Sequence, residues 1–221
     1  MKRAIVIGSG AGGATVAKEL QGRFDVTILE AGGVFHPFTG NLSVIEKLRK
    51  TGLLFDERLI QLLFPPMKVR KTTDKVVMVN GIGIGGTTTI STANAVRKDH
   101  DLQEIGINLD SEYQELEGEI PISSEHRKNW HAHTNQVFEV CQDMDLQPVV
   151  TPKMTDFNTC TRCGRCVLGC PREAKWDTRN FINQAVEDGA HLITGCRVQK
   201  IIIKNGQATG IQAIMGRHLK F

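Results

Sequence analysis

The stretch AIVIGSGAGGATVAKEL, residues 4–20, decides the fold of the N-terminal part of the chain. Its apolar start at 4–7 predicts a buried strand, and the run from Ala11 to Leu20 predicts a helix after a tight turn. Three glycines have the spacing G-x-G-x-x-G: Gly8, Gly10 and Gly13. In a dinucleotide-binding unit the first permits the turn, the second lets backbone approach a pyrophosphate, and the third packs helix against strand.

The next apolar run, DVTILE at 25–30, predicts a second strand that ends in the carboxylate of Glu30. A carboxylate at this place binds ribose hydroxyls and repels a 2′-phosphate, while the free N–H groups of the helix N-terminus bind phosphates. The pattern therefore predicts an α/β, Rossmann-like fold for NAD or FAD.

A further strand that leads into a second glycine-rich loop is predicted in VVMVNGIGIGGTTTISTANAVRKD, residues 76–99. Its glycines are Gly81, Gly83, Gly85 and Gly86. A flavin cofactor needs a second cradle of backbone N–H and hydroxyl groups, whereas a plain NAD domain does not, so the loop favours FAD. The alternative is a buried strand and a tight turn with no ligand.

Composition sets wide bounds. The chain has 221 residues, 40% of them hydrophobic and 23% charged, and its net charge of +3 is too small to indicate nucleic-acid binding. The glycines within the N-terminal apolar run argue against a signal peptide, and no apolar run approaches the roughly 20 residues that span a bilayer. We expect no transmembrane segment and a cytoplasmic location, with peripheral membrane contact as an alternative. Six cysteines in that compartment favour metal or redox chemistry over disulfides.

The segment CTRCGRCVLGCPREAK, residues 160–175, has the spacing C-x2-C-x2-C-x3-C-P that bacterial ferredoxins use for iron–sulfur clusters. Structural zinc usually requires two C-x2-C pairs that are much farther apart. We predict a cluster, of 4Fe-4S type, with these ligands: Cys160, Cys163, Cys166 and Cys170. Zinc or free thiols are the alternatives, and Cys196 or Cys141 could replace Cys170 as the fourth ligand. Nearby cations would raise a cluster's potential, or form a solvated rim or a docking patch for an acidic partner: Arg162, Arg165, Arg172, Lys175 and Arg179.

Three separated motifs resemble the glucose–methanol–choline (GMC) oxidoreductases. They are the N-terminal fingerprint, the loop GIGIGGTTTIS at 81–91, and FINQAVEDGAHLITGCRVQKIIIKNGQATGIQA at 181–213. The branch with long-chain alcohol oxidases and related bacterial dehydrogenases is the most similar. The resemblance implies FAD-binding positions at Gly8, Gly10, Ala11, Gly13, Glu30, Ala31, Gly85, Gly86, Thr87 and, through backbone groups toward adenine, Val198. Threonines stand where the family usually has serines after the paired glycines.

We expect a discontinuous FAD-binding domain (1–33, 76–99 and 177–221), a lid insertion (34–75), a helical segment (100–156) and the cysteine-rich loop (157–176). In the insertion, Ser43 with Glu46 and then Asp56 predict two helix starts. The second helix would pack an apolar face over the cofactor: Leu59, Leu62, Leu63 and Phe64. Helices are expected near 111–120 and 131–145, and a hairpin at 200–214. Three histidines are predicted to be surface residues: His126, His131 and His133.

GMC relatives are longer, and the resemblance puts their substrate domain and catalytic His beyond this sequence. The fold is therefore expected to be incomplete, without the strand that would return beside 4–7, and no catalytic residue is expected here. We predict a dehydrogenase half that oxidises an alcohol or sugar hydroxyl and passes electrons through the cluster to an acceptor protein or carrier. Its obligate partner would be a C-terminal-half subunit, a truncated chain being the other explanation. The alternative functions are a redox subunit without substrate chemistry and an oxygen-using GMC-type oxidase with structural cysteines.

Overall fold

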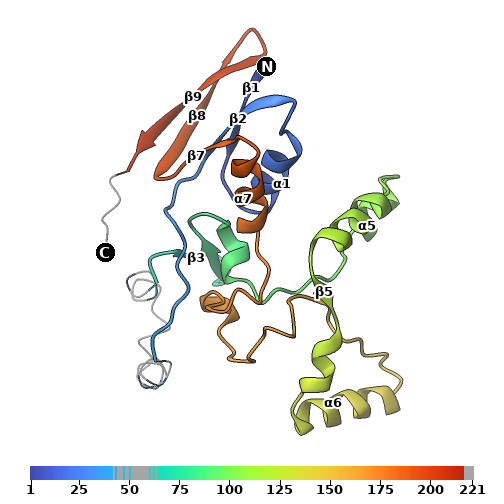
Figure 1. Cartoon of the computed structure of the whole chain (residues 1–221). Helices are drawn as coiled ribbons and strands as arrows, with labels where there is room; N and C mark the ends of the chain where they lie inside the picture. The colour runs from blue at the N-terminus through green and yellow to red at the C-terminus, as the bar shows by residue number, and fades with distance from the viewer. Residues whose placement is uncertain are drawn as a thin grey trace. The chain divides into compact units, whose positions relative to one another are not determined.

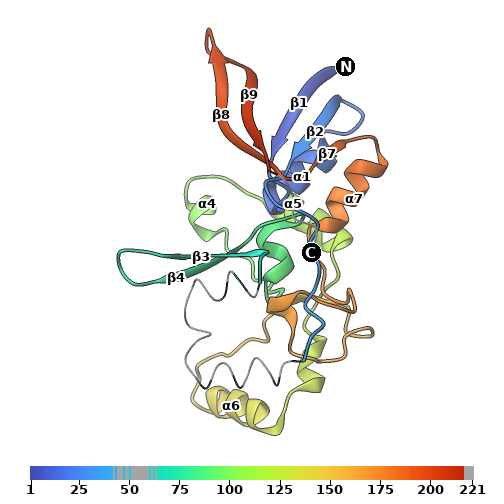
Figure 2. The same ribbon diagram turned by 90° about the vertical axis from the view of Figure 1, so that its left-hand side faces the viewer.

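The computed structural model describes residues 1–41, 43, 47, 50, 60, 62 and 64–216. The chain forms two compact units (Figures 1 and 2). Unit 1 comprises Met1–Ser91, Val167–Pro171 and Asp177–Phe221, and unit 2 comprises Thr92–Cys166 and Arg172–Trp176.

A small parallel sheet is the centre of unit 1. Strand β1 (Lys2–Ile7) pairs in parallel with β2 (Phe24–Leu29), and helix α1 (Ala11–Glu19) connects them. This confirms the strand, turn, helix and strand predicted from the first glycine motif. Strand β7 (His191–Ile193) then pairs in parallel with β2, which gives the order β1-β2-β7. The fold is therefore a partial Rossmann-like α/β arrangement, as expected.

The core of unit 1 lies between this sheet and two helices. Helix α7 (Arg179–Glu187) packs against α1 (Figure 1). Small residues on α1 allow the close approach, and larger apolar residues of β2 and α7 fill the interface. The buried side chains include Ala14, Ala17, Val26, Ile28, Phe181, Ile182 and Ala185. The outer strand β1 is less covered, with Ile5 46% and Ile7 47% exposed.

Two hairpins complete the strands of unit 1. The β8 (Cys196–Lys204) and β9 (Gln207–Met215) pair confirms the hairpin predicted from the Asn-Gly turn. Asn205 and Gly206 both have positive φ, of 51° and 75°, as a tight primed turn requires. The other hairpin, β3 (Met67–Lys71) with β4 (Val77–Gly81), was not predicted. A short 3-10 helix, η2 (Gly86–Ile90), follows it.

Unit 2 is mostly helical. Its helices are α4 (His100–Glu104), α5 (Asp110–Glu119) and α6 (Ala132–Asp143), with a short 3-10 helix η3 (Glu125–Asn129). The last two α-helices confirm the predictions near 111–120 and 131–145. Two short strands, β5 (Ile122–Ser123) and β6 (Lys153–Met154), pair in antiparallel fashion. A third 3-10 helix, η4 (Cys166–Leu168), lies within the cysteine-rich segment, where the chain leaves unit 2.

The predictions for 34–75 are only partly testable. Glu46, Asp56, Leu59 and Leu63 lie outside the described residues, so the two predicted helix starts and half of the apolar face stay predictions. Phe64 packs edge-on against Phe38, with ring centroids 5.5 Å apart. Leu62 is 75% exposed, and its packing over a bound cofactor stays a prediction.

Candidate functional site

The first glycine loop leaves the N-terminus of α1 open. Gly10 is the N-cap residue, and no side chain of the described residues caps the helix there. The first backbone N–H groups of such a helix have no partner within the helix, and they carry a partial positive charge. A Cβ added at Gly8 or Gly12 would meet nothing within 4 Å, so the outer side of the turn is open. The loop can therefore hold a phosphate group.

Glycines also let this loop contact the second one. A Cβ on Gly86 would lie 2.9 Å from the Cα atom of Gly10, and Gly86 has φ +54°. A Cβ on Gly32 would lie 2.5 Å from the backbone N of Gly83. Inside the first loop, a Cβ on Gly13 would lie 2.0 Å from the carbonyl oxygen of Gly8. The two loops thus meet backbone to backbone, which only glycine permits.

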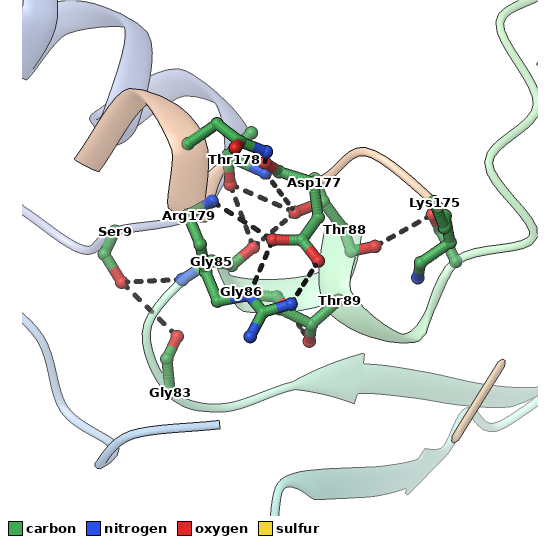
Figure 3. Close-up of polar contacts among 12 residues, drawn as sticks. Ser9, Gly83, Gly85, Gly86, Thr88, Thr89, Lys175, Asp177, Thr178 and Arg179 are labelled. Carbon is green, nitrogen blue, oxygen red and sulfur yellow. Dashed lines mark hydrogen bonds and ion pairs between the residues drawn. The ribbon is translucent and has the colours of Figure 1, made fainter. Parts of the chain in front are cut away.

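A buried serine, Ser9, contacts the second glycine loop (Figure 3) and also the acid that follows β2, Glu30. The Ser9 hydroxyl donates to Oε2 of Glu30 at 2.6 Å, and the Ser9 N–H donates to the same oxygen at 2.9 Å. The N–H of Gly85 donates to the Ser9 hydroxyl at 3.3 Å. Oε1 of Glu30 accepts from the N–H of Gly32 at 2.8 Å. Glu30, which is 6% exposed, therefore organises both loops, and the second lone pair of Oε1 leaves capacity for a ribose hydroxyl.

Two threonines fix the second loop to the start of α7. The hydroxyls of Thr88 and Thr178 both donate to the carbonyl of Gly85, at 2.7 and 3.1 Å. The Thr178 N–H donates to the Thr88 hydroxyl at 3.1 Å. Beside them, the guanidinium of Arg179 donates twice to the carboxylate of Asp177, which is 1% exposed (Figure 3). A paired, bidentate arrangement is what a buried carboxylate requires.

Backbone hydrogen bonds between the end of β2 and the start of β8 place the segment predicted to bind adenine beside Glu30. The N–H of Cys196 donates to the Glu30 carbonyl at 2.8 Å, and that of Gly195 donates to the Gly32 carbonyl at 2.9 Å. Val198 follows on β8, two residues later, and Ala31 lies between Glu30 and Gly32. Both loops, the end of β2 and the start of β8 thus belong to one connected set of backbone contacts.

An apolar pocket of about 390 Å³ has Thr87 among its lining residues. The Thr87 hydroxyl accepts from the N–H of Gly81 at 3.2 Å, so its methyl-bearing side chain is held in place. The lining residues are Ile60, Phe64, Met67, Val79, Thr87, Ile90, Val167 and Leu168. The pocket can therefore bind an apolar group close to the second glycine loop.

The cysteine segment is divided between the units. Cys160, Cys163 and Cys166 belong to unit 2, and Cys170 belongs to unit 1. None of these four cysteines forms a disulfide in the described part of the chain, and Cys163 is exposed. Tetrahedral zinc with bonds of about 2.3 Å would hold its thiolates about 4 Å apart. In the described part of the chain, no three cysteine thiols lie within 4.8 Å of one another, so no zinc-sized site is preformed. A four-iron cluster holds its thiolates farther apart, and this spacing does not test it.

Three exposed side chains of α4 have ligand atoms within 4.8 Å of one another: His100, Asp101 and Glu104. Of the three predicted surface histidines, His131 and His133 are exposed. The prediction that His126 is a surface residue is wrong, because His126 is half-buried. Its Nδ1 accepts from the indole N–H of Trp130 at 2.8 Å. Its Nε2 therefore donates to the Thr151 carbonyl, also at 2.8 Å. Its role is structural.

Comparison with known proteins decides the family. A family model described as GMC oxidoreductase matches residues 3–220. The chain belongs to the GMC oxidoreductase family. The matched region is the N-terminal FAD-binding region of these oxidoreductases. The first glycine loop fits that cofactor, because a Cβ at Gly8 or Gly12 would meet nothing within 4 Å among the described residues.

Individual GMC relatives are similar at low identity. A long-chain-alcohol oxidase of Arabidopsis thaliana, FAO4B, is 30% identical over 217 residues, 90% of this chain and 27% of that protein. An uncharacterized GMC-type oxidoreductase of Mycobacterium tuberculosis is 26% identical over 228 residues, covering 95% of this chain and 34% of that protein. An uncharacterized protein of Methanocaldococcus jannaschii is 25% identical over 202 residues, 90% and 42% of the two chains. The chain thus spans between 27% and 42% of the length of these curated relatives.

Several residues of this GMC site were missed in the sequence. Ser9, Asp177 and Thr178 carry its polar network, and Gly32 makes the second backbone contact, with Gly83 of the predicted loop. The only available signal was the Asp-Thr pair just before the apolar helix at 179–187, which is typical of a helix start. Within the described ranges, no helix combines the length and apolarity that a bilayer crossing requires.

Proposed function

We propose that this chain is the FAD-binding part of a GMC-type dehydrogenase that oxidises a CH–OH group. The observation that carries the proposal is the backbone contact between the two glycine loops, with Gly86 against Gly10, beside an uncapped helix N-terminus. FAD supplies a two-electron acceptor that takes a hydride from the hydroxyl-bearing carbon of a substrate. Family membership supports oxidoreductase chemistry of this kind.

The roles proposed for this chain are binding and orientation. The N-terminus of α1 would hold the pyrophosphate, and Glu30 would accept from a ribose hydroxyl while keeping Ser9 and Gly32 in place. The threonine pair, Thr88 and Thr178, would fix the second loop so that the ring system meets a rigid backbone. The base that takes the hydroxyl proton is proposed to lie in the substrate part of the enzyme, outside this sequence.

The apolar pocket supports a substrate with a hydrophobic body. It lies beside Thr87, one residue after the loop that would follow the pyrophosphate and flavin, and Met67, Ile90 and Leu168 line it. One similar protein is named a long-chain-alcohol oxidase, which agrees with an apolar alcohol as substrate class. A sugar would leave its hydroxyl groups without partners in such a pocket.

We propose further that the cysteine segment binds an iron–sulfur cluster through Cys160, Cys163, Cys166 and Cys170, and that electrons from the substrate leave through it one at a time. The support is the ferredoxin spacing. The backbone of the segment also bends repeatedly, with positive φ at four positions: Arg162, Gly164, Gly169 and Glu173. Lys175, 3% exposed, donates to the Cys166 carbonyl at 3.2 Å and would place positive charge beside the cluster.

A partner is the third part of the proposal. Strand β1 is an edge of the sheet in the described residues, and its exposed Ile5 and Ile7 could pair with a further strand. We propose that a C-terminal-half subunit with the substrate domain and the catalytic His supplies it. An acceptor protein or carrier would then take the electrons. Co-purification of that subunit with a tagged copy of this chain is expected, and recovery of an active, FAD-loaded monomer would contradict the partner.

Iron, acid-labile sulfide and FAD should be measured on anaerobically purified protein. We expect about four irons per FAD for a 4Fe-4S cluster. Cys163→Ser should lower the iron content, while Cys141→Ser, a half-buried cysteine of α6, should not. Flavin without iron would instead support an oxidase with structural cysteines. If an apolar alcohol failed to bleach the flavin of the assembled complex, a redox subunit without substrate chemistry would be the better reading.

A further inference from the structure

The β3–β4 hairpin (Figure 2) carries an exposed apolar run that begins one residue before β4. Four successive residues remain open: Val76 56%, Val77 56%, Met78 48% and Val79 41%. Successive side chains of a strand point to opposite faces, so a strand that covers a core buries every second one. Both faces of the outer part of β4 are instead accessible, although this part of the chain is a regular, hydrogen-bonded hairpin.

The same hairpin has a net positive charge as large as that of the whole chain. Residues 67–81 hold four basic side chains, Lys68, Arg70, Lys71 and Lys75, and one acidic side chain, Asp74. Their net charge of +3 equals that of the whole chain, so the basic and acidic residues elsewhere cancel. In the strand register, Arg70 faces Met78 and Lys71 faces Val77. Each exposed apolar side chain in these pairs therefore has a cation directly across from it.

The turn between the strands is well defined. The N–H of Thr72 donates to the Val76 carbonyl at 2.9 Å, and the N–H of Val76 donates to the Thr72 hydroxyl at 3.2 Å. The N–H of Lys75 donates to the Thr72 carbonyl at 3.1 Å, with Lys75 at φ 62°. The apolar and basic side chains are thus presented on a preorganised scaffold, which reduces the ordering cost of binding.

We propose that this hairpin docks on an anionic lipid surface. A lipid interface accepts both kinds of side chain, since the headgroups bind the cations while the apolar residues enter the acyl boundary. An acidic protein would pair with the cations but would cover Val76–Val79 only if it offered a matching apolar strip. A second copy pairing through β4 would bring the same positive charge against itself.

One consequence concerns the substrate, and it rests on the proposed function, whereas the docking itself does not. Met67 and Val79, at the root of the hairpin, also line the apolar pocket beside Thr87. A strand of five residues spans about 17 Å, so a docked hairpin would keep the pocket within that distance of the lipid. An apolar alcohol could then reach the pocket from the bilayer.

Sedimentation with vesicles tests the docking on the full chain with its FAD. The probes are vesicles of phosphatidylcholine and of phosphatidylcholine with phosphatidylglycerol, each at low and at high salt. Two double variants alter the hairpin: Val77→Ser with Met78→Ser, and Lys71→Gln with Lys75→Gln. The matched controls change the same kinds of residue in β8, where Ile203 and Lys200 are also exposed: Ile203→Ser and Lys200→Gln.

We expect binding to the anionic vesicles that weakens in high salt. The lysine variant should bind about 25-fold more weakly, since each of its two removed cations contributes about fivefold near an anionic surface. The serine variant should also lose binding, and both controls should bind like the wild type. No vesicle binding, equal binding to both vesicles, or equal losses in variants and controls would overturn the proposal. Loss of a protein partner or of self-association in the variants, without vesicle binding, would also overturn it. FAD content, measured in parallel, reports on the proposed function separately.

Discussion

Replacing Ser9 with alanine should loosen both glycine loops at once. Its side chain is fully buried and gives the carboxylate of Glu30 a hydrogen bond of 2.6 Å, while accepting the N–H of Gly85 at 3.3 Å. A hydrogen bond to a charged group contributes roughly 1.5–3 kcal/mol, and a buried donor left unsatisfied costs roughly 1–3 kcal/mol. Glu30 keeps the N–H groups of Ser9 and Gly32 as donors, so we expect Ser9→Ala to lower the free energy of unfolding by about 3 kcal/mol.

Urea unfolding followed by circular dichroism measures this loss, and quenching of flavin fluorescence measures FAD affinity. Because Gly85 is released from the first loop, we expect FAD to bind at least about tenfold more weakly, which corresponds to about 1.4 kcal/mol. Thr15→Ala is the matched control, since that hydroxyl donates to a backbone carbonyl at an accessible place on α1. Its effect should stay within about 0.5 kcal/mol. If Ser9→Ala were as mild as the control in both measurements, the role assigned to the serine would be refuted.

Gly86→Ala should abolish FAD retention, because the new methyl group would lie 2.9 Å from a backbone atom of the first loop, at φ +54°. Gly210→Ala, whose methyl group meets nothing within 4 Å, should retain the cofactor in the same absorbance assay, and equal losses would contradict the argument. In α5, Gly118→Ala should raise the free energy of unfolding by roughly 0.5–1 kcal/mol, and a decrease in urea unfolding would speak against an open helix position there. The Arg97 guanidinium holds the pKa of Asp99 below its usual range. The ion pair therefore stabilises the fold at pH values above the ordinary carboxyl pKa, and this stabilisation is lost as the pH falls below about 4. The Tm difference between wild type and Arg97→Gln should therefore shrink between about pH 7 and about pH 3. A constant Tm difference would refute this argument.

Local patterns in the sequence were enough to predict the βαβ unit and the β8–β9 hairpin. The spacing of Gly8, Gly10 and Gly13 describes a turn and a helix start within a few residues, so α1 and its two strands were confirmed. The Asn205–Gly206 turn is equally local, since positive φ at both positions selects these residue types. The family resemblance depended on the same short motifs, and the match over residues 3–220 agrees with it.

The contacts that hold the site together were decided by tertiary structure. Ser9 and Gly85 are 76 positions apart, and Gly85 and Thr178 are 93 apart, so no local pattern connects them. The apolar run before the second glycine loop predicted a strand, which β4 confirms, but its pairing with β3 was missed because no local pattern tells which segment a strand pairs with. The sequence by itself determined the glycine spacing, the turn types and the order of the cysteines. Only the fold decided which of these distant groups meet, because a hydrogen bond or a backbone contact requires two segments to arrive within a few ångströms of each other.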